Sequence, residues 1–313
     1  MKKNLRFVCA QPAIPYYTWQ VEVMLNNFEQ MGVNLNNIDV VCWKGNGVIH
    51  EDWQKLANNY AARFFFYDDT RQTKNYISSI RPNILKQHWE NHPYLKDETI
   101  FYHDCDIIFT KPISEWITED MINDYKWYGS DCRWYIGHDY ILSKGQDVLD
   151  LMCDIVGIDS KVVSDNEMNA IGAQYIMKDL TYYFWDRVER ESELLFRDVN
   201  RLNDQKKIKD STHHELQIWC ADMWAVLWNG FKMGKIVECH PNLEFSWATS
   251  SEEDYLRMKI FHNAGVTTES GLFRKANYMN KTPYEEVLDI KENTSSWHYY
   301  ELIKKVSKNS VLI

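Results

Sequence analysis

Short apolar segments alternate with helical patterns through the first third of the chain, and this alternation is the feature that most constrains the fold. Four segments are typical of buried strands: Leu5–Ala10, Ile38–Trp43, Ala62–Tyr67 and Thr99–His103. The spacing of apolar side chains between them predicts three helices: Trp19–Met31, Glu51–Tyr60 and Tyr76–Trp89. Such an order favours an α/β fold with a mixed, mostly parallel central sheet flanked by helices and a Rossmann-like first half.

The second half of the chain has a less regular pattern. Four further strands are predicted: Trp127–Gly129, Gly172–Lys178, Lys235–Cys239 and Arg257–Phe261. A helix is predicted over His214–Trp228, where Glu215 and Asp222, seven residues apart, would share one face. Trp297–Val306 is amphipathic. Since the sequence has no internal repeat or linker, we expect residues 1–313 to form a single domain.

Composition narrows the class of protein. The net charge of -10 disfavours a broad electrostatic contact with nucleic acid or anionic membrane, without excluding a local one. No apolar stretch is long enough to span a bilayer, and the run ending at Gln11-Pro12 is too short for a signal peptide core. Seven cysteines without a CxxC pair argue against a disulfide framework or a structural zinc site. Together these features predict a cytoplasmic protein with reduced thiols.

The segment Tyr102–Phe109 carries the most informative chemistry. Asp104 and Asp106 are separated by one residue, in a turn between two apolar strands. The alternation of a strand would leave both carboxylates on one side, while Cys105 faces the other. Ligands in α/β sheets bind beyond the carboxyl ends of the strands, and carboxylates prefer divalent cations such as Mg²⁺ or Mn²⁺. The sequence therefore predicts a divalent metal site at this turn.

This turn resembles the DxD motif of nucleotide-sugar glycosyltransferases with the GT-A fold. The resemblance implies that Asp106 binds the metal directly and that Asp104 lies beside it, on the metal or the donor's ribose. Further along the chain, Phe261–Gly265 resembles the HxxG element of these enzymes, of family 8 especially. There the resemblance implies that His262 completes a Mn²⁺ or Mg²⁺ site, as neutral imidazole can. It also implies that Asn263 and Gly265 approach the diphosphate.

Other donor contacts are implied by the same resemblance. Family 8 continues with Lys-Pro-Trp, whereas here Lys275 follows a longer insertion without Pro-Trp, and Arg274 is a competing cation. The nucleotide is expected over the end of the first strand, with Tyr16 or Tyr17 available to stack. The remaining predicted donor contacts are Ala10, Gln11, Pro12, Tyr17, Lys44, Arg81 and Lys86.

Catalytic groups are predicted in the second half. Ile171–Met177 resembles the small-residue strand under the donor sugar, which implies that Gln174 contacts sugar hydroxyls. Asp222 is the first candidate for a general base and Glu215 the second, if the reaction inverts the anomeric carbon. If it retains the configuration, Gln174 or Asp222 would instead steady the oxocarbenium-like sugar. The sequence leaves the stereochemistry, the sugar and the acceptor open.

The sequence thus predicts a metal-dependent glycosyltransferase that moves a sugar from a nucleoside-diphosphate sugar, preferably a UDP-sugar, to an acceptor hydroxyl. The resemblance divides the chain into a donor half (1–110), an acceptor half (111–281) and a tail (282–313). A glycan, lipid-linked sugar, protein or modified base would serve as acceptor. The first alternative is a nucleotidyltransferase acting on sugar phosphates, but Ala10–Ala13 is not the glycine-rich loop it should have. The second is a non-catalytic carbohydrate-binding protein, which the predicted long helices disfavour.

Overall fold

The computed structural model describes residues 4–45 and 47–313, which divide into two compact units. One unit combines Asn4–Asp68, Phe101–Ile122 and Pro241–Ile313, and we call it the terminal unit. The other, which we call the middle unit, combines Asp69–Ile100 with Asn123–His240. Each unit is therefore built from segments that are far apart in the sequence.

Seven strands form the larger sheet, in the order β3-β2-β1-β4-β7-β6-β8. Their bounds are β1 Leu5–Pro12, β2 Ile38–Trp43, β3 Arg63–Tyr67, β4 Thr99–His103, β6 Trp127–Asp131, β7 Ile171–Lys178 and β8 Val237–Cys239. β1 and β3 pair with β2 in parallel, and β6 pairs in parallel with β8 but antiparallel with β7. This arrangement confirms the predicted mixed, mostly parallel sheet, including the bounds of β2 and β4.

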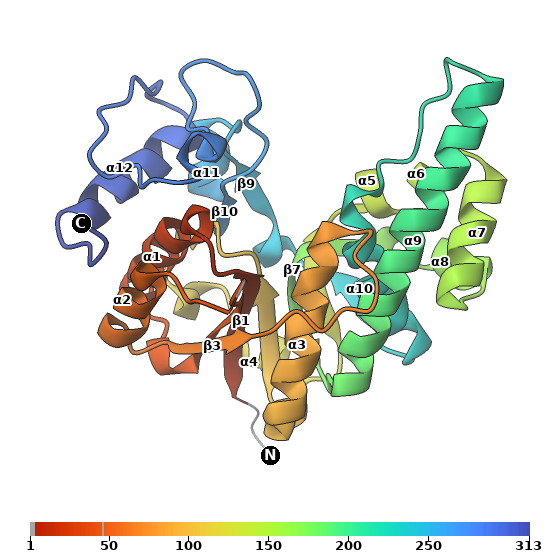
Figure 1. Cartoon of the computed structure of the whole chain (residues 1–313), viewed down its shortest axis with the longest axis horizontal. Coiled ribbons are helices and arrows are strands. Elements are labelled where there is room, and N and C mark those ends of the chain that lie inside the picture. Colours follow the sequence, from red (N-terminus) through yellow and green to blue (C-terminus); the bar gives the residue numbers. More distant parts are fainter. Residues whose placement is uncertain (1–3, 46) are drawn as a thin grey trace. The chain divides into compact units, whose positions relative to one another are not determined.

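The terminal unit joins the two ends of the chain. Its helices are α1 Pro15–Gln30, α2 Glu51–Asn59, α11 Glu252–Arg257 and α12 Ser295–Ser307. A three-stranded sheet orders β5 (Ile107–Phe109), β10 (Ile260–His262) and β9 (Phe245–Trp247) side by side. α12 packs against α1, so blue C-terminal segments lie beside red N-terminal ones in Figure 1. Buried side chains from both ends, among them Trp19, Phe261 and Tyr299, share one hydrophobic core.

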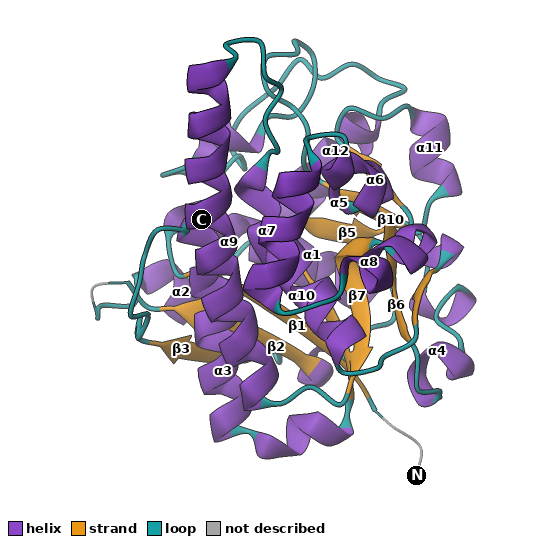
Figure 2. Cartoon of the chain, turned by 90° about the vertical axis from the view of Figure 1, so that its right-hand side faces the viewer, coloured by secondary structure: helices purple, strands orange, loops and turns teal. Residues whose placement is uncertain are grey.

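The middle unit is built around one long helix, α9 (Tyr182–Lys209), 28 residues in length. α3 (Ile80–Asn91), α7 (Gln146–Val156) and α10 (Ala221–Lys232) pack against it (Figure 2). The Thr181 hydroxyl caps the first turn of α9 by accepting a hydrogen bond from the amide of Phe184, and three lysines lie in its last turn, where they suit the helix dipole. The shorter helices are α4 Glu119–Asn123, α5 Arg133–Ile136, α6 His138–Leu142 and α8 Ser160–Asp165.

The predicted helix over His214–Trp228 is wrong in its first part. A 3₁₀ turn covers Ile218–Cys220, and α10 begins only at Ala221. The side-chain amide of Asn203 donates to the backbone carbonyl of Leu216, 3.0 Å away, so that carbonyl is engaged outside any helix. Glu215 therefore lies in an irregular segment and does not share a helix face with Asp222.

The predicted strand Arg257–Phe261 is also displaced. Ser251 caps a short helix, α11, that extends to Arg257, because its hydroxyl accepts from the amide of Asp254. The strand that follows, β10, covers Ile260–His262 and so includes the histidine.

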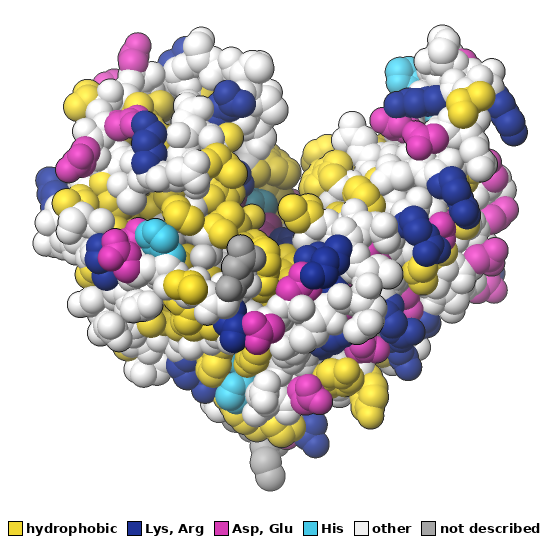
Figure 3. Space-filling model, viewed as in Figure 1, with side chains coloured by type: hydrophobic (Ala, Val, Ile, Leu, Met, Phe, Trp, Pro, Cys, Tyr) yellow, Lys and Arg dark blue, Asp and Glu magenta, His cyan; other side chains and the backbone are white. Residues whose placement is uncertain are grey.

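Three further observations concern the described residues as a whole. Among them, none of the helices combines the length and the apolar character needed to cross a membrane. All seven cysteines lie in described segments, and all are free thiols. On the face drawn in Figure 3, acidic and basic side chains are interspersed rather than segregated.

Candidate metal and donor site

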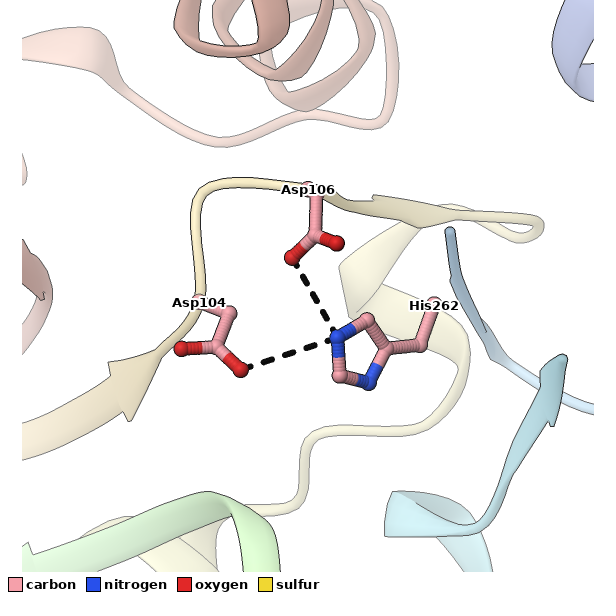
Figure 4. A group of neighbouring side chains, drawn as sticks. All are labelled: Asp104, Asp106 and His262. Carbon is pink, nitrogen blue, oxygen red and sulfur yellow. Dashed lines mark ion pairs between the residues drawn. The ribbon is translucent and has the colours of Figure 1, made fainter. Parts of the chain in front are cut away.

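Asp104, Asp106 and His262 meet in the terminal unit (Figure 4). The two aspartates lie in the turn between β4 and β5, and β5 pairs with β10 so that Ile107 is opposite His262. Nε2 of His262 lies 3.2 Å from Oδ1 of Asp106 and 3.6 Å from Oδ2 of Asp104. The backbone amide of Asn263 donates to the carbonyl of Asp106, 2.9 Å away, which fixes the two segments together.

The chemistry of this cluster fits a divalent cation. One ligand atom from each of the three side chains lies within 4.8 Å of the other two. Asp106 and His262 are buried, and Asp104 is half-buried. Two carboxylates and an imidazole are a ligand set that suits Mn²⁺ and Mg²⁺. The predicted convergence of a distant histidine on the Asp-Cys-Asp turn is thus present in the structure.

Lys275 supplies positive charge to the same cluster through an ion pair with Oδ2 of Asp106. Burial raises the pKa of Asp106, but the positive charges of Lys275 and His262 outweigh it and hold this pKa well below its usual range. Burial lowers the pKa of Lys275, and the Asp106 carboxylate outweighs it and raises the pKa. Asp106 is therefore ionised, as a metal ligand must be.

Trp247 fixes the orientation of His262, a contact that the sequence did not indicate. The two rings stack with their centroids 5.7 Å apart and their planes at 17°. The two residues are paired between the parallel strands β9 and β10. Since this pairing joins strands rather than near neighbours in the chain, no spacing in the sequence indicates it. Nδ1 of His262 is buried and has no hydrogen-bond partner among the described residues, so ring contacts with Trp247 and with Phe245, whose centroid lies 5.5 Å away, restrain the imidazole.

The segment after His262 has two features expected of a ligand-binding backbone. Gly265 has φ 94°, a left-handed conformation that side chains disfavour. The amide group of Asn263 is buried and interacts with the Tyr299 hydroxyl, but neither its nitrogen nor its oxygen has a hydrogen bond of good geometry among the described residues. A buried amide without partners is costly unless a ligand or water satisfies it.

The other predicted donor contacts of the terminal unit lie at the ends of β1 and β2. Ala10 and Gln11 are buried, and the Gln11 amide donates to the carbonyl of Val41, 3.2 Å away. Pro12 pairs with Trp43, and Lys44 forms an ion pair of 3.0 Å with Asp68.

The two tyrosines that open α1 differ in their surroundings. Burial raises the pKa of Tyr16, and the positive charge of Lys275 partly offsets this rise, so Tyr16 lies within electrostatic reach of the cluster. The predicted contact was Tyr17, whose ring meets Tyr16 edge to face at 4.8 Å. Both tyrosines are candidates in the sequence to stack on the nucleotide, and no feature of the sequence distinguishes one from the other.

In the middle unit, Arg81 and Asp222 form one ion pair. Nη2 of Arg81 lies 2.6 Å from Oδ2 of Asp222, and the Tyr76 hydroxyl donates to Oδ1, also at 2.6 Å. Asp222 is buried in the first turn of α10. Burial, together with the Asp222 charge, raises the pKa of Tyr76, so this hydroxyl stays a donor. The structure thus joins a predicted donor contact to a predicted base.

The remaining predicted residues of the middle unit have separate partners. Nζ of Lys86 lies 2.7 Å from Oε2 of Glu189, and this ion pair links α3 to α9. Gln174 is fully buried, and its Oε1 accepts from the Ser130 hydroxyl at 2.8 Å. Glu215 forms an ion pair of 2.6 Å with Lys207. These three positions do not form a cluster with one another.

Known proteins resemble this chain in fold and not in sequence. No family model and no curated protein sequence matches it. It is similar to the apo structure of WbbM, a bifunctional glycosyltransferase, with a TM-score of 0.51 and 10% identity over 99% of this chain and 52% of that one. The galactosyltransferase LgtC, solved with donor and acceptor sugar analogues, matches with a TM-score of 0.44 and 10% identity over 97% of this chain and 95% of LgtC. Mouse xyloside xylosyltransferase 1 matches with a TM-score of 0.43 and 11% identity over 84% of this chain and 98% of the mouse protein.

The likeness to WbbM defines the class of fold. The chain has the α/β fold of GT-A glycosyltransferases, as its DxD-like turn predicted, and it spans about half the length of WbbM. At 10% identity the likeness concerns the fold alone.

Proposed function

We propose that this chain is a metal-dependent glycosyltransferase that moves a sugar from a nucleoside-diphosphate sugar, preferably a UDP-sugar, to an acceptor hydroxyl. The observation that carries the proposal is the cluster of Asp104, Asp106 and His262 beyond the end of β4 in a GT-A fold. Ligands of α/β sheets bind at such strand ends. The solved proteins of similar fold include WbbM, a bifunctional glycosyltransferase.

Charge stabilisation is the main task of the terminal unit in this mechanism. Asp104, Asp106 and His262 would hold Mn²⁺ or Mg²⁺, which when bound neutralises the negative charge of a leaving diphosphate. Lys275 adds a second positive charge beside them. The unsatisfied amide of Asn263 and the open backbone at Gly265 would bind phosphate or ribose oxygens.

The stereochemistry we favour is retention. An inverting reaction needs a general base, but both oxygens of Asp222 already accept hydrogen bonds, from Arg81 and Tyr76. Glu215, the second candidate, is engaged by Lys207. We therefore propose that Gln174, whose buried side-chain nitrogen has no hydrogen-bond partner among the described residues, steadies the sugar at the transition state. We also place the protein in a reducing compartment such as the cytoplasm, since its seven free thiols suit one.

Two measurements test the proposal. Thermal denaturation with Mn²⁺ and a panel of nucleotides should show stabilisation by UDP or GDP, but not by ATP, and the effect should vanish in EDTA. Donor hydrolysis should be detectable with at least one nucleotide sugar and should be lost in Asp106→Ala. If no nucleoside-diphosphate sugar stabilises the protein or is hydrolysed, the proposal fails.

A further inference from the structure

A pocket of about 580 Å³ opens in the middle unit, and no residue of the metal cluster lines it. Its volume is typical of small-molecule sites, which span about 300–1,000 Å³. The lining comes from α5, α6 and the turn that follows it, the last turns of α9 and the irregular segment 213–217. Figure 3 shows basic, acidic and histidine side chains gathered over this end of α9, at the upper right.

The aromatic side of the pocket is formed by Trp134, Tyr135 and Tyr140. Trp134 is 65% exposed, whereas eight other tryptophans of the chain are at most 2% exposed. The Tyr135 hydroxyl is turned towards Sγ of Cys132, at 2.9 Å, which leaves the apolar ring to line the pocket. An exposed indole beside a second ring is a flat apolar surface of the kind on which the C–H faces of a sugar stack.

The polar side of the pocket offers both donors and acceptors. Lys207 and Glu215 compensate each other's charge through their ion pair of 2.6 Å, and Lys144 lies 5.1 Å above the ring of Tyr140. Sugar hydroxyls both donate and accept hydrogen bonds, so they suit a wall of ammonium, carboxylate, imidazole and amide groups. A phosphate only accepts, and the Glu215 carboxylate would repel it.

A third observation points to a missing partner. Nε2 of His213, which lines the pocket, is buried and has no hydrogen-bond partner among the described residues. The segment that carries it is not helical, and the amide of Asn203 binds the Leu216 carbonyl of this segment at 3.0 Å. This is the segment where the helical pattern of the sequence fails, and such failures tend to mark functional sites.

We infer that this pocket binds a sugar ring of the acceptor, stacked on Trp134 and hydrogen-bonded to His213 and the Lys207–Glu215 pair. The acceptor is then an uncharged saccharide rather than a protein or a nucleic acid base. This inference rests on the proposed function, because it identifies the molecule that receives the sugar.

A glycan array tests the inference with the full chain. Wild-type protein should bind one group of neutral glycans, and Trp134→Ala should weaken that binding by about tenfold or more. Trp134→Phe, which keeps a ring, should retain most of it. The matched control is Tyr183→Ala, since Tyr183 is a 72% exposed aromatic on α9 that does not line the pocket.

The same samples separate this inference from the proposed function. Stabilisation by UDP or GDP with Mn²⁺, measured on wild type and Trp134→Ala, should be equal. If it is present but no neutral glycan binds, or if Trp134→Ala binds as well as wild type, the pocket assignment is wrong and the transferase proposal stands. Binding only to sulfated or phosphorylated probes also overturns it. If glycans bind through Trp134 but no nucleotide stabilises the protein, the proposed function fails instead.

Discussion

Two buried carboxylates of the terminal unit, those of Glu22 and Asp106, are satisfied in opposite ways. Glu22 accepts hydrogen bonds from the hydroxyls of Tyr60, Tyr284 and Ser310 and from the amide of Val311. Asp106 instead faces the imidazole of His262 and the ammonium of Lys275. A carboxylate surrounded by neutral donors fixes the fold, because every partner is part of the chain. A carboxylate whose partners are basic side chains can bind a metal ion in place of one of those side chains.

Asp106→Asn provides the largest expected contrast. The variant keeps the shape of the side chain but removes the negative charge that a cation needs, so metal-dependent donor hydrolysis should fall by about 100-fold or more. The melting temperature should fall modestly, because Lys275 loses its ion-pair partner but is itself partly exposed to water. Steady-state hydrolysis and thermal denaturation of the same sample check both statements. Asp97→Asn, an exposed aspartate, is the control, and equal losses in the two variants would contradict the assignment.

Glu22→Gln should show the reverse behaviour. Replacing this carboxylate weakens four hydrogen bonds, and it places an amide NH₂ against donors, so the free energy of unfolding should fall by about 2 kcal/mol. Donor hydrolysis per folded molecule should stay at the wild-type value. Chemical denaturation measures the loss, with Glu29→Gln, an exposed position on the same helix, as the matched control. A stable Glu22→Gln protein that lacks activity would erase the distinction between the two carboxylates.

Lys275→Met separates metal binding from donor binding. Lys275 occupies Oδ2 of Asp106, so its removal should tighten the binding of Mn²⁺ alone by about tenfold. Binding of UDP in the presence of Mn²⁺ should weaken, because the diphosphate loses a cation. Calorimetric titration first with Mn²⁺ and then with UDP measures the two effects. Lys281→Met is the control, since Lys281 is exposed and pairs with Glu286. Parallel changes in both affinities would show that Lys275 acts only through folding.

The same contrast explains how much of the molecule could be predicted from the sequence. Patterns that act within a few residues were reliable: the strands β2 and β4 and the Asp104–Asp106 turn follow from local apolar runs and spacing. His262 was reached through a motif and not through its strand, since the predicted strand ended one residue before it. The partners of Glu22 lie as far away as Val311 and belong to no motif, so this cluster was not predicted.

Predictions failed where one distant side chain overrides a local pattern. The apolar spacing after His214 favours a helix, but Asn203 takes the carbonyl of Leu216 and the helix begins later. Glu215 consequently lies in the wall of a pocket. The pattern of neighbouring residues carries no information about such a tertiary contact.

The smallest expected effect concerns Trp247, which contacts the cluster without being a ligand. Trp247→Leu keeps an apolar side chain but removes the ring that stacks on His262, so the imidazole gains freedom. Mn²⁺ should then bind several-fold more weakly, which is less than the ~10–100-fold typical of groups that hydrogen-bond to a metal ligand. Titration calorimetry with Mn²⁺ measures this change. Trp297→Leu, another half-buried tryptophan of the terminal unit, should leave the affinity unchanged. Because a general loss of stability would affect both variants alike, a difference confined to Trp247→Leu assigns the effect to the orientation of His262.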